Sequence, residues 1–263
     1  MATLSWSKNF QVERSARLLT GDDKSKFLDI PYYLHLWAGS TAGKRVLDFG
    51  CGSGKSAAGV ALLHDAALVV GVDINTESDS CRQFLTDQIG LAAQPGNLVF
   101  EEITPGNTTS FSDFDVIFSW SVFEHVNNRL YQPILHQLIS KMKPGGLFFV
   151  QISPLYFSPE GSHLWSIGYY QWEHLVNQTS DVYDDIMRCE ALSQGEKDAL
   201  WSMFRTLNRI TAEDLISRFE NAGLTLLRHQ KDQVSLDPPS SLLNAYQTSA
   251  LKTHQIVALF QKG

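Results

Sequence analysis

Short apolar runs alternate with longer helical stretches through the middle of the chain. The apolar runs cover residues 45–49, 67–73, 97–101, 114–120 and 147–152. The stretches between them that predict helices cover residues 55–65, 76–89 and 127–142. Alternation of this kind predicts an α/β fold, in which a parallel sheet is covered by helices on both faces. Residues 143–146, Lys-Pro-Gly-Gly, predict a turn between the last of these helices and its strand.

The alternation stops after Ile152. Residues 153–209 are too long for a simple connection, so they predict a lid or an inserted segment, helical over residues 180–207. A helix is expected again from Thr211, a capping residue with two acidic residues in the turn that follows, to Ala222. Further strands are expected at residues 224–228 and 255–261.

Composition narrows the function classes. The chain has 263 residues, 43% of them hydrophobic, which suits one large domain or one domain with an insertion. The net charge is −7 and no Lys/Arg cluster stands out, so a nucleic-acid partner is not expected. The first residues lack the pattern of a signal peptide, and no apolar stretch is long enough to span a bilayer. A cytoplasmic protein without a membrane partner is expected, and no particular oligomeric state is indicated.

Three cysteines, Cys51, Cys81 and Cys189, lie far apart and form no CxxC pair. This spacing argues against both a disulfide framework and a cysteine-based zinc site.

Residues 46–59, VLDFGCGSGKSAAG, form a glycine-rich loop that can be interpreted in two ways. The Gly54-Lys55-Ser56 end resembles a phosphate-binding P-loop, but that motif requires glycine at the position of Phe49. The dinucleotide pattern G-x-G-x-x-G also fails, because it requires glycine at the position of Lys55. What remains is an acidic residue at a strand end, followed by Gly-x-Gly-x-Gly at the start of a helix.

This loop contains the first of four motifs that, in order, resemble those of the class I S-adenosylmethionine-dependent methyltransferases. They are VLDFGCGSG at 46–54, VVGVDIN at 69–75, FDVIFSWSVFEHV at 114–126 and MKPGGLFFV at 142–150. The resemblance implies a Rossmann-like, seven-stranded, mostly parallel sheet with an inserted lid after strand five. It also implies S-adenosyl-L-methionine as the cofactor and S-adenosyl-L-homocysteine as the product.

On this basis the chain divides into four parts. We expect an N-terminal helical cap over residues 1–43 and an S-adenosylmethionine-binding core over residues 44–152. An insertion that forms the lid and substrate region is expected over residues 153–209, and the C-terminal part of the core over residues 210–263. Three aromatic residues of the cap, Tyr32, Tyr33 and Trp37, are expected to help cover the cofactor.

The resemblance also implies the cofactor-binding residues. They are Asp48, Phe49, Gly50, Cys51, Gly52, Gly54, Asp73, Ile74, Glu102, Ile103, Ser119 and Trp120. Glycines let the backbone approach the methionine part of the cofactor, and a helix N-terminus favours its carboxylate. Asp73 offers two acceptor oxygens to the ribose hydroxyls, and Ile74 can cover one face of the adenine.

These residues also have structural interpretations. The glycines could serve only a tight turn, and Asp73 could cap the helix that follows. Lys55 and Ser56 fit an exposed first helical turn. In the third motif of the family an acidic residue follows strand three, where this chain has Thr104, so Glu102 and Ile103 are expected near the adenine instead.

Candidates for the methyl-transfer chemistry are histidines. A base is needed if the acceptor is a hydroxyl, and His163 is the first candidate because it lies in a loop segment close to strand five. His125 and His174 are the other candidates, and each of the three could instead be structural. Related methyltransferases of ubiquinone pathways bind a divalent metal through two carboxylates and a histidine after strand four. At those positions this chain has Ser121, Glu124 and His125, so no metal site is predicted.

Aromatic residues concentrate at the start of the insertion, over residues 153–175. This segment resembles that of methyltransferases from polysaccharide or secondary-metabolite pathways. Aromatic side chains among polar groups suit a hydroxylated small molecule, which makes Tyr156, Trp165 and Trp172 candidate substrate-binding residues. The alternative is that they form the insertion's own core.

The sequence thus predicts a methyltransferase that acts on a small-molecule acceptor, at oxygen of a sugar-like or secondary-metabolite substrate. An alternative is an S-adenosylmethionine-binding regulatory or scaffold protein that has lost catalysis. Hydrolysis of a nucleotide phosphate is disfavoured by the spacing of the loop glycines.

Overall fold

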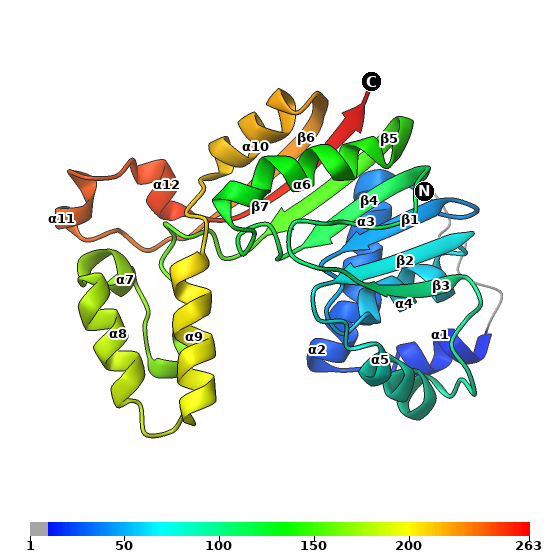
Figure 1. Ribbon diagram of the computed structural model, residues 1–263, viewed down its shortest axis with the longest axis horizontal. Helices are drawn as coiled ribbons and strands as arrows, with labels where there is room; N and C mark the ends of the chain where they lie inside the picture. Colours follow the sequence, from blue (N-terminus) through cyan, green and yellow to red (C-terminus); the bar gives the residue numbers. More distant parts are fainter. Residues whose placement is uncertain (1–9) are drawn as a thin grey trace.

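The computed structural model describes residues 10–263 and contains a single seven-stranded sheet in that range (Figure 1). The residues on which the absence of a signal peptide was predicted lie outside the described part. The strands are β1 Arg45–Phe49, β2 Leu68–Asp73, β3 Leu98–Glu102, β4 Phe114–Trp120, β5 Met142–Ile152, β6 Leu224–Gln233 and β7 Thr253–Lys262. Their order in the sheet is β3-β2-β1-β4-β5-β7-β6.

Strands β1 to β5 are parallel, and β7 is antiparallel to both of its neighbours, β5 and β6. The expected α/β fold with a mostly parallel sheet is therefore confirmed. The strand order reverses beside β1, where β2 lies on one side and β4 on the other. Open α/β sheets bind ligands at such a switch point, outside the carboxyl ends of the strands.

Helices cover both faces of the sheet. On one face lie α1 Phe10–Ala16, α3 Ile30–Ala38, α4 Lys55–Leu63 and α5 Ser78–Phe84, whose buried residues share one apolar core with the sheet. On the other face, α6 Asn128–Ser140 and α10 Ala212–Asn221 share a second core with it (Figure 1). A short helix, α2 Gly21–Lys24, and a π-helical segment, Ser25–Asp29, connect α1 to α3.

Most expected strand boundaries lie within two residues of the observed ones, but two of them, in β5 and β6, differ by five residues. Strand β5 begins at Met142, because residues 142–146 pair irregularly with β4 instead of forming a separate turn. The register between β4 and β5 shifts between Phe114 and Val116, and Gly145 adopts a φ of 72°, which accommodates the bulge. Strand β6 extends to Gln233, beyond the expected end, because it pairs with β7 along most of its length.

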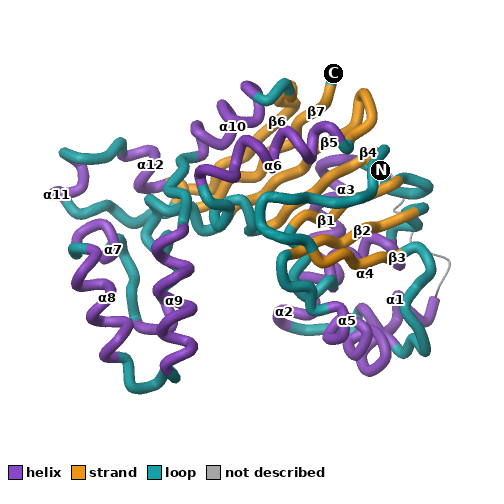
Figure 2. Tube along the Cα trace, viewed as in Figure 1, coloured by secondary structure: helices purple, strands orange, loops and turns teal. Residues whose placement is uncertain are grey.

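After β5 the chain leaves the sheet and builds a helical hairpin. It contains α7 Glu173–Val176, α8 Thr179–Arg188 and α9 Gln194–Thr206. Figure 2 shows α8 and α9 side by side, projecting away from the sheet. The hairpin has its own apolar core, and α9 begins with a capping box formed by Ser193 and Glu196.

Two further short helices, α11 Ser240–Leu243 and α12 Thr248–Lys252, lie between β6 and β7. They pack against Trp172 next to α7, so the C-terminal part of the chain supports the insertion. Within the described residues, no helix has both the length and the apolar character needed to cross a membrane.

Candidate active site

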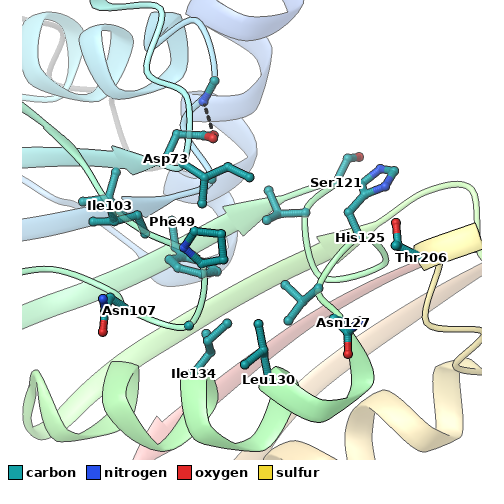
Figure 3. A pocket seen from close by; sticks show the side chains of 18 residues that line it. Phe49, Asp73, Ile103, Asn107, Ser121, His125, Asn127, Leu130, Ile134 and Thr206 are labelled. Atoms are coloured by element: carbon teal, nitrogen blue, oxygen red, sulfur yellow. Dashed lines mark hydrogen bonds between the residues drawn. The ribbon is translucent and has the colours of Figure 1, made fainter. Parts of the chain in front are cut away.

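Two adjoining cavities open at the carboxyl ends of the parallel strands. The larger has a volume of about 530 Å³ and the smaller about 350 Å³. Both are lined by Gly50, Gly52 and Ser121, so they meet at the loops that follow β1 and β4. Figure 3 shows the larger cavity, with Asp73 and Ile103 on one side and Leu130 and Ile134 of α6 on another.

The glycine loop after β1 lies between the cavities in a backbone conformation that side chains disfavour. Gly50, Gly52 and Gly54 have φ values of 82°, 48° and 71°. A Cβ at Gly50 would come within 2.2 Å of Val122, and one at Gly54 within 2.4 Å of Phe100. A Cβ at Gly52 would meet no atom of the described chain within 4 Å, because Gly52 faces the open space of the cavities.

Asp73, at the end of β2, is held beside this loop. Its Oδ2 accepts a hydrogen bond from the backbone N–H of Gly52 at 2.8 Å, and its Oδ1 accepts one from Asn75 at 3.1 Å. A carboxylate has about four acceptor positions, so both oxygens can still accept from a ligand. Ile74 follows with 59% of its side chain exposed, on the wall of the larger cavity.

The smaller cavity combines opposite charges. Asp48 is 3% exposed, and its Oδ2 has no hydrogen-bond partner among residues 10–263. Burial, reinforced by the nearby charge of Asp73, raises the pKa of Asp48 well above its usual value. Lys26 lines the same cavity and pairs with Asp22 at 3.0 Å. The cavity therefore offers an acceptor at one place and a cationic group at another.

Lys55 lies outside both cavities. Its Nζ pairs with Asp23 of α2 at 2.5 Å and lies 5.1 Å from the centre of the Phe84 ring. The lysine that a P-loop would aim at a phosphate is thus engaged with two side chains behind the loop. This arrangement agrees with the rejection of the P-loop.

Two histidines and a glutamate meet beyond the end of β4. The rings of His125 and His163 lie 4.9 Å apart, and ligand atoms of His125, His163 and Glu124 are all within 4.8 Å of one another. His125 lines the larger cavity, and partial desolvation of its ring lowers its pKa. Desolvation, followed by the charge of His125, lowers the pKa of His163 to about 4. Burial raises the pKa of Glu124 to about 8.

Most of the predicted cofactor residues line a cavity. Those on the larger cavity are Phe49, Gly50, Gly52, Asp73, Ile74 and Ile103. Those on the smaller cavity are Asp48, Gly50, Cys51, Gly52 and Trp120.

The structure does not bring Gly54, Glu102 and Ser119 to either cavity wall. Gly54 precedes α4 in a left-handed conformation that leaves room for the Phe100 ring. Glu102 has an exposed side chain at the end of β3. Ser119 is fully buried, and its Oγ donates a hydrogen bond to the carbonyl of Phe49 at 2.9 Å.

The candidates of the insertion separate into buried and exposed residues. Tyr156 is buried in the core of the insertion, and His174 contacts its carbonyl oxygen through Nε2 at 2.7 Å. Burial lowers the pKa of His174 to about 4. Trp172 is 2% exposed and donates to the carbonyl of Leu251 at 3.0 Å. Trp165 is 46% exposed, with its ring 5.3 Å from that of His163.

Several cavity residues have no motif that reveals them. Four line the smaller cavity from the N-terminal helices, namely Asp22, Ser25, Lys26 and Ile30. Thr206 at the end of α9 lines the larger one close to His125 (Figure 3). Of the expected cap aromatics, Tyr33 packs against Trp120, with ring centres 5.8 Å apart. None of the three expected aromatics, Tyr32, Tyr33 and Trp37, lines either cavity.

The fold, the glycine loop and the acidic residue at the end of β2 together define a class I methyltransferase. The chain belongs to the methyltransferase-domain family, whose family model matches residues 27–229. The glycine loop and Asp73, which line the two cavities, are the features on which a methyl-donor site is proposed below.

Similar proteins agree with this class. A ubiquinone biosynthesis O-methyltransferase of Actinobacillus pleuropneumoniae is 30% identical over 118 residues, which are 44% of this chain and 49% of the relative. The chain thus spans about half the length of that relative. A trans-aconitate 2-methyltransferase of Rhodopseudomonas palustris is 25% identical over 206 residues, 77% of this chain and 76% of the relative.

Among solved structures, a 1,6-didemethyltoxoflavin-N1-methyltransferase of Burkholderia thailandensis with bound S-adenosylhomocysteine has a TM-score of 0.53. The match covers 91% of this chain and 79% of that one. At 14% identity, this likeness shows the shared fold alone.

Proposed function

We propose that this methyltransferase transfers the methyl group of S-adenosylmethionine to a hydroxyl oxygen of a small, sugar-like or secondary-metabolite acceptor. The observation that carries the proposal is the pair of His125 and His163, whose rings lie 4.9 Å apart at the edge of the larger cavity. When a neutral hydroxyl is methylated, its proton must leave the acceptor, and imidazole is the side chain best suited to accept it near neutral pH.

The cavities suggest how the cofactor lies. Adenosine fits the larger one, where Asp73 can accept from the ribose hydroxyls and the apolar wall with Ile74 and Ile103 can cover the adenine. The zwitterionic methionine end fits the smaller one, where Asp48 can accept from the ammonium and Lys26 can donate to the carboxylate. In this placement the carboxylate takes over from Asp22 as the partner of Lys26.

The sulfonium then lies where the cavities meet. Gly50, Gly52 and Ser121 line both of them, so the methyl group is expected close to these three residues. His125 follows Ser121 by four residues in the loop after β4, and it also lines the larger cavity. The histidine pair is therefore close to the expected position of the methyl group.

The protonation of these histidines suits the reaction. The pKa values of both are lowered, that of His163 to about 4, so both imidazoles are neutral near neutral pH and have a free electron pair. An oxygen lone pair of the acceptor forms the new O–CH₃ bond while the S–CH₃ bond breaks. The bonding electrons remain on sulfur, which leaves as a neutral thioether, and the hydroxyl proton passes to the imidazole pair. The hydroxyl becomes strongly acidic as its oxygen is methylated, so a base of low pKa suffices.

The position of Trp165 suits an acceptor that contains a ring. Its side chain is 46% exposed and lies next to His163, so a flat or sugar-like face could stack on it while a hydroxyl reaches the histidines. Tyr156 and Trp172 are engaged in packing, and we assign them to the support of this segment.

Relatives give independent support for oxygen as the acceptor atom. The name of the Actinobacillus pleuropneumoniae relative places its methyl transfer at oxygen, and the Rhodopseudomonas palustris relative is named for a small organic acid. The Burkholderia thailandensis enzyme, similar in fold alone, is named for transfer to nitrogen. The choice of oxygen for this chain thus depends on its histidine pair and on its sequence relatives.

A screen with isotopically labelled methyl donor tests the proposal. Matched pairs of small molecules that differ only in hydroxyl against amine are incubated with the protein, and label in the product is counted. We expect label in hydroxylated members, and none with Gly52→Val, which serves as the control because it is expected to abolish cofactor binding. Label confined to the amines would contradict the assignment to oxygen.

A further inference from the structure

Glu124 lies against the histidine pair, and the chemistry proposed above gives its buried carboxylate no role. We propose that these three side chains bind one divalent cation of the zinc, manganese or cobalt type. The inference rests on the proposed function for its purpose, and it refines the role of His163 from proton acceptor to ligand. It also departs from the sequence pattern, which predicts no metal site.

Glu124 is the anchor of the cluster. Its side chain is 3% exposed, and neither carboxylate oxygen has a hydrogen-bond partner among the described residues. A buried carboxylate without partners is costly unless a cation or a proton compensates it. Because both oxygens are free, Glu124 can coordinate through one or both of them.

The loop that carries Glu124 is held rigidly. The backbone N–H of Asn208, just after α9, donates to the carbonyl of Glu124 at 3.0 Å. The Asn208 side chain donates to the carbonyls of Phe123 and Val126. Three hydrogen bonds from one buried residue fix the loop, so the orientation of Glu124 and His125 is preorganised.

His163 presents one ring nitrogen to the cluster. Its Nε2 has no partner within residues 10–263, while a hydrogen bond with the backbone of Pro154 engages the ring. A histidine ligand commonly donates its other N–H to a backbone carbonyl, which leaves the lone pair of the ligating nitrogen free. His163 also has a φ of 58°, a conformation that is costly for a residue with a side chain and that recurs at functional sites.

His125 places the cluster at the edge of the larger cavity. Glu124 is buried, His163 is half-buried and His125 is exposed, so the cluster is closed on one side and open on the other. Three protein ligands with one open side are the arrangement of catalytic rather than structural metal sites. An acceptor hydroxyl bound at the open position would lose its proton more readily.

The ligand set selects the class of metal. Two imidazoles and one carboxylate favour zinc, manganese, iron or cobalt over magnesium and calcium, which prefer oxygen ligands. Ser121, where related enzymes have a first carboxylate, is not available. Its Oγ donates to Oε1 of Gln151 at 3.0 Å and approaches the carbonyl of Ser153 at 3.3 Å. In our proposal His163, from the insertion, supplies the third ligand instead.

Cobalt is a suitable probe because its visible absorption reports nitrogen and oxygen coordination directly. Full-length protein is stripped with a chelator and titrated with Co²⁺, and Zn²⁺ is then added in competition. We expect one Co²⁺ per chain, displaced by one Zn²⁺. His163→Gln and Glu124→Gln should each weaken Co²⁺ binding at least tenfold. His136→Gln is the matched control, because His136 is an exposed histidine on α6 outside the cluster.

The proposal is overturned if stripped wild-type protein shows no saturable Co²⁺ absorption, or if His136→Gln weakens it as much as His163→Gln does. In the same samples, calorimetry measures S-adenosylmethionine binding, which should be equal in all of them and confirms that the variants are folded. Absent metal binding with intact cofactor binding and intact hydroxyl methylation refutes the cation site and leaves the proposed function standing. Absent hydroxyl methylation in protein that does bind Co²⁺ refutes the function instead.

Discussion

The carboxylate of Asp73 accepts a hydrogen bond from the backbone N–H of Gly52 at 2.8 Å, which joins the end of β2 to the glycine loop after β1. This contact holds the two most diagnostic elements of the cofactor site in a fixed relation. Both residues line the larger cavity, so each can be tested through cofactor affinity.

The first prediction concerns Asp73 itself. Asp73→Ala should weaken S-adenosylmethionine binding tenfold or more, because hydrogen bonds to a charged acceptor contribute about 1.5–3 kcal/mol. Asp73→Asn keeps one acceptor oxygen and should lie between the alanine variant and the wild type. Calorimetric titration measures both. Unchanged affinity in a folded alanine variant would contradict the assignment of Asp73 as the partner of the ribose hydroxyls.

A second prediction uses the open space at Gly52. Gly52→Val should abolish cofactor binding, because the added side chain enters the space between the cavities. Gly43→Val is the matched control: Gly43 also has a positive φ, 72°, and a Cβ there would meet no atom of the described chain within 4 Å. Both variants carry similar backbone strain, but only one faces the site. Equal binding by the two variants would contradict the loop assignment.

The third prediction separates the methyl-donor loop from a phosphate loop. Lys55→Ala should change cofactor affinity by less than roughly threefold and lower the free energy of unfolding by only about 1 kcal/mol, through loss of the ion pair with Asp23 and the Phe84 contact. Calorimetry and urea unfolding check the two values. A loss of affinity above roughly tenfold would show that Lys55 reaches the ligand after all.

A fourth prediction addresses the histidine pair. His163→Ala should lower turnover by about 10²–10⁴ at saturating cofactor, the usual effect of removing a group that handles the acceptor proton. Cofactor affinity should not change, because His163 lines neither cavity. His136→Ala, on the exposed side of α6, should leave the rate unaltered. Single-turnover kinetics decides, and wild-type turnover in His163→Ala would exclude His163 from the chemistry.

The fifth prediction is a dependence of stability on pH. Burial, followed by the charge of His35, lowers the pKa of His64 to about 4, whereas an unfolded histidine has its usual value of about 6.5. Between these values the unfolded state binds a proton that the folded state does not, so stability falls as the pH drops from about 6.5 towards 4. His64→Gln should remove about 1–3 kcal/mol of that loss. Urea unfolding at pH 7 and pH 4.5 gives the free energy of unfolding of each protein at both pH values. An equal loss of stability in the wild type and in His64→Gln would contradict the assignment.

Local patterns were sufficient to predict much of the fold. The bounds of β1 and β4 agree with the sequence prediction at both ends, because each is a short apolar run between clear breaks. The helix after Thr211 was also predicted correctly, and the Thr211 side chain accepts from Asp214 at its start. Such features depend on residues close in sequence.

The smaller cavity could not be predicted in the same way, because Lys26 reaches it through tertiary packing. One weak signal was present in the sequence: Gly59 lies inside α4, where glycine is unfavourable. A Cβ at Gly59 would come within 2.1 Å of the carbonyl of Phe27, so this glycine lets the segment with Lys26 approach the loop helix. The position of His125 likewise depends on contacts between distant segments, because Asn208 binds the backbone of Phe123 and Val126 on either side of it.

The most direct test of the account is the atom that receives the methyl group. The enzyme is supplied with S-adenosylmethionine carrying ¹³C in its methyl group and with an acceptor that offers both a hydroxyl and an amine, and the product is examined by NMR. The account predicts that the labelled carbon is bonded to oxygen, as a methoxy group. A labelled methyl group on nitrogen or carbon would contradict it.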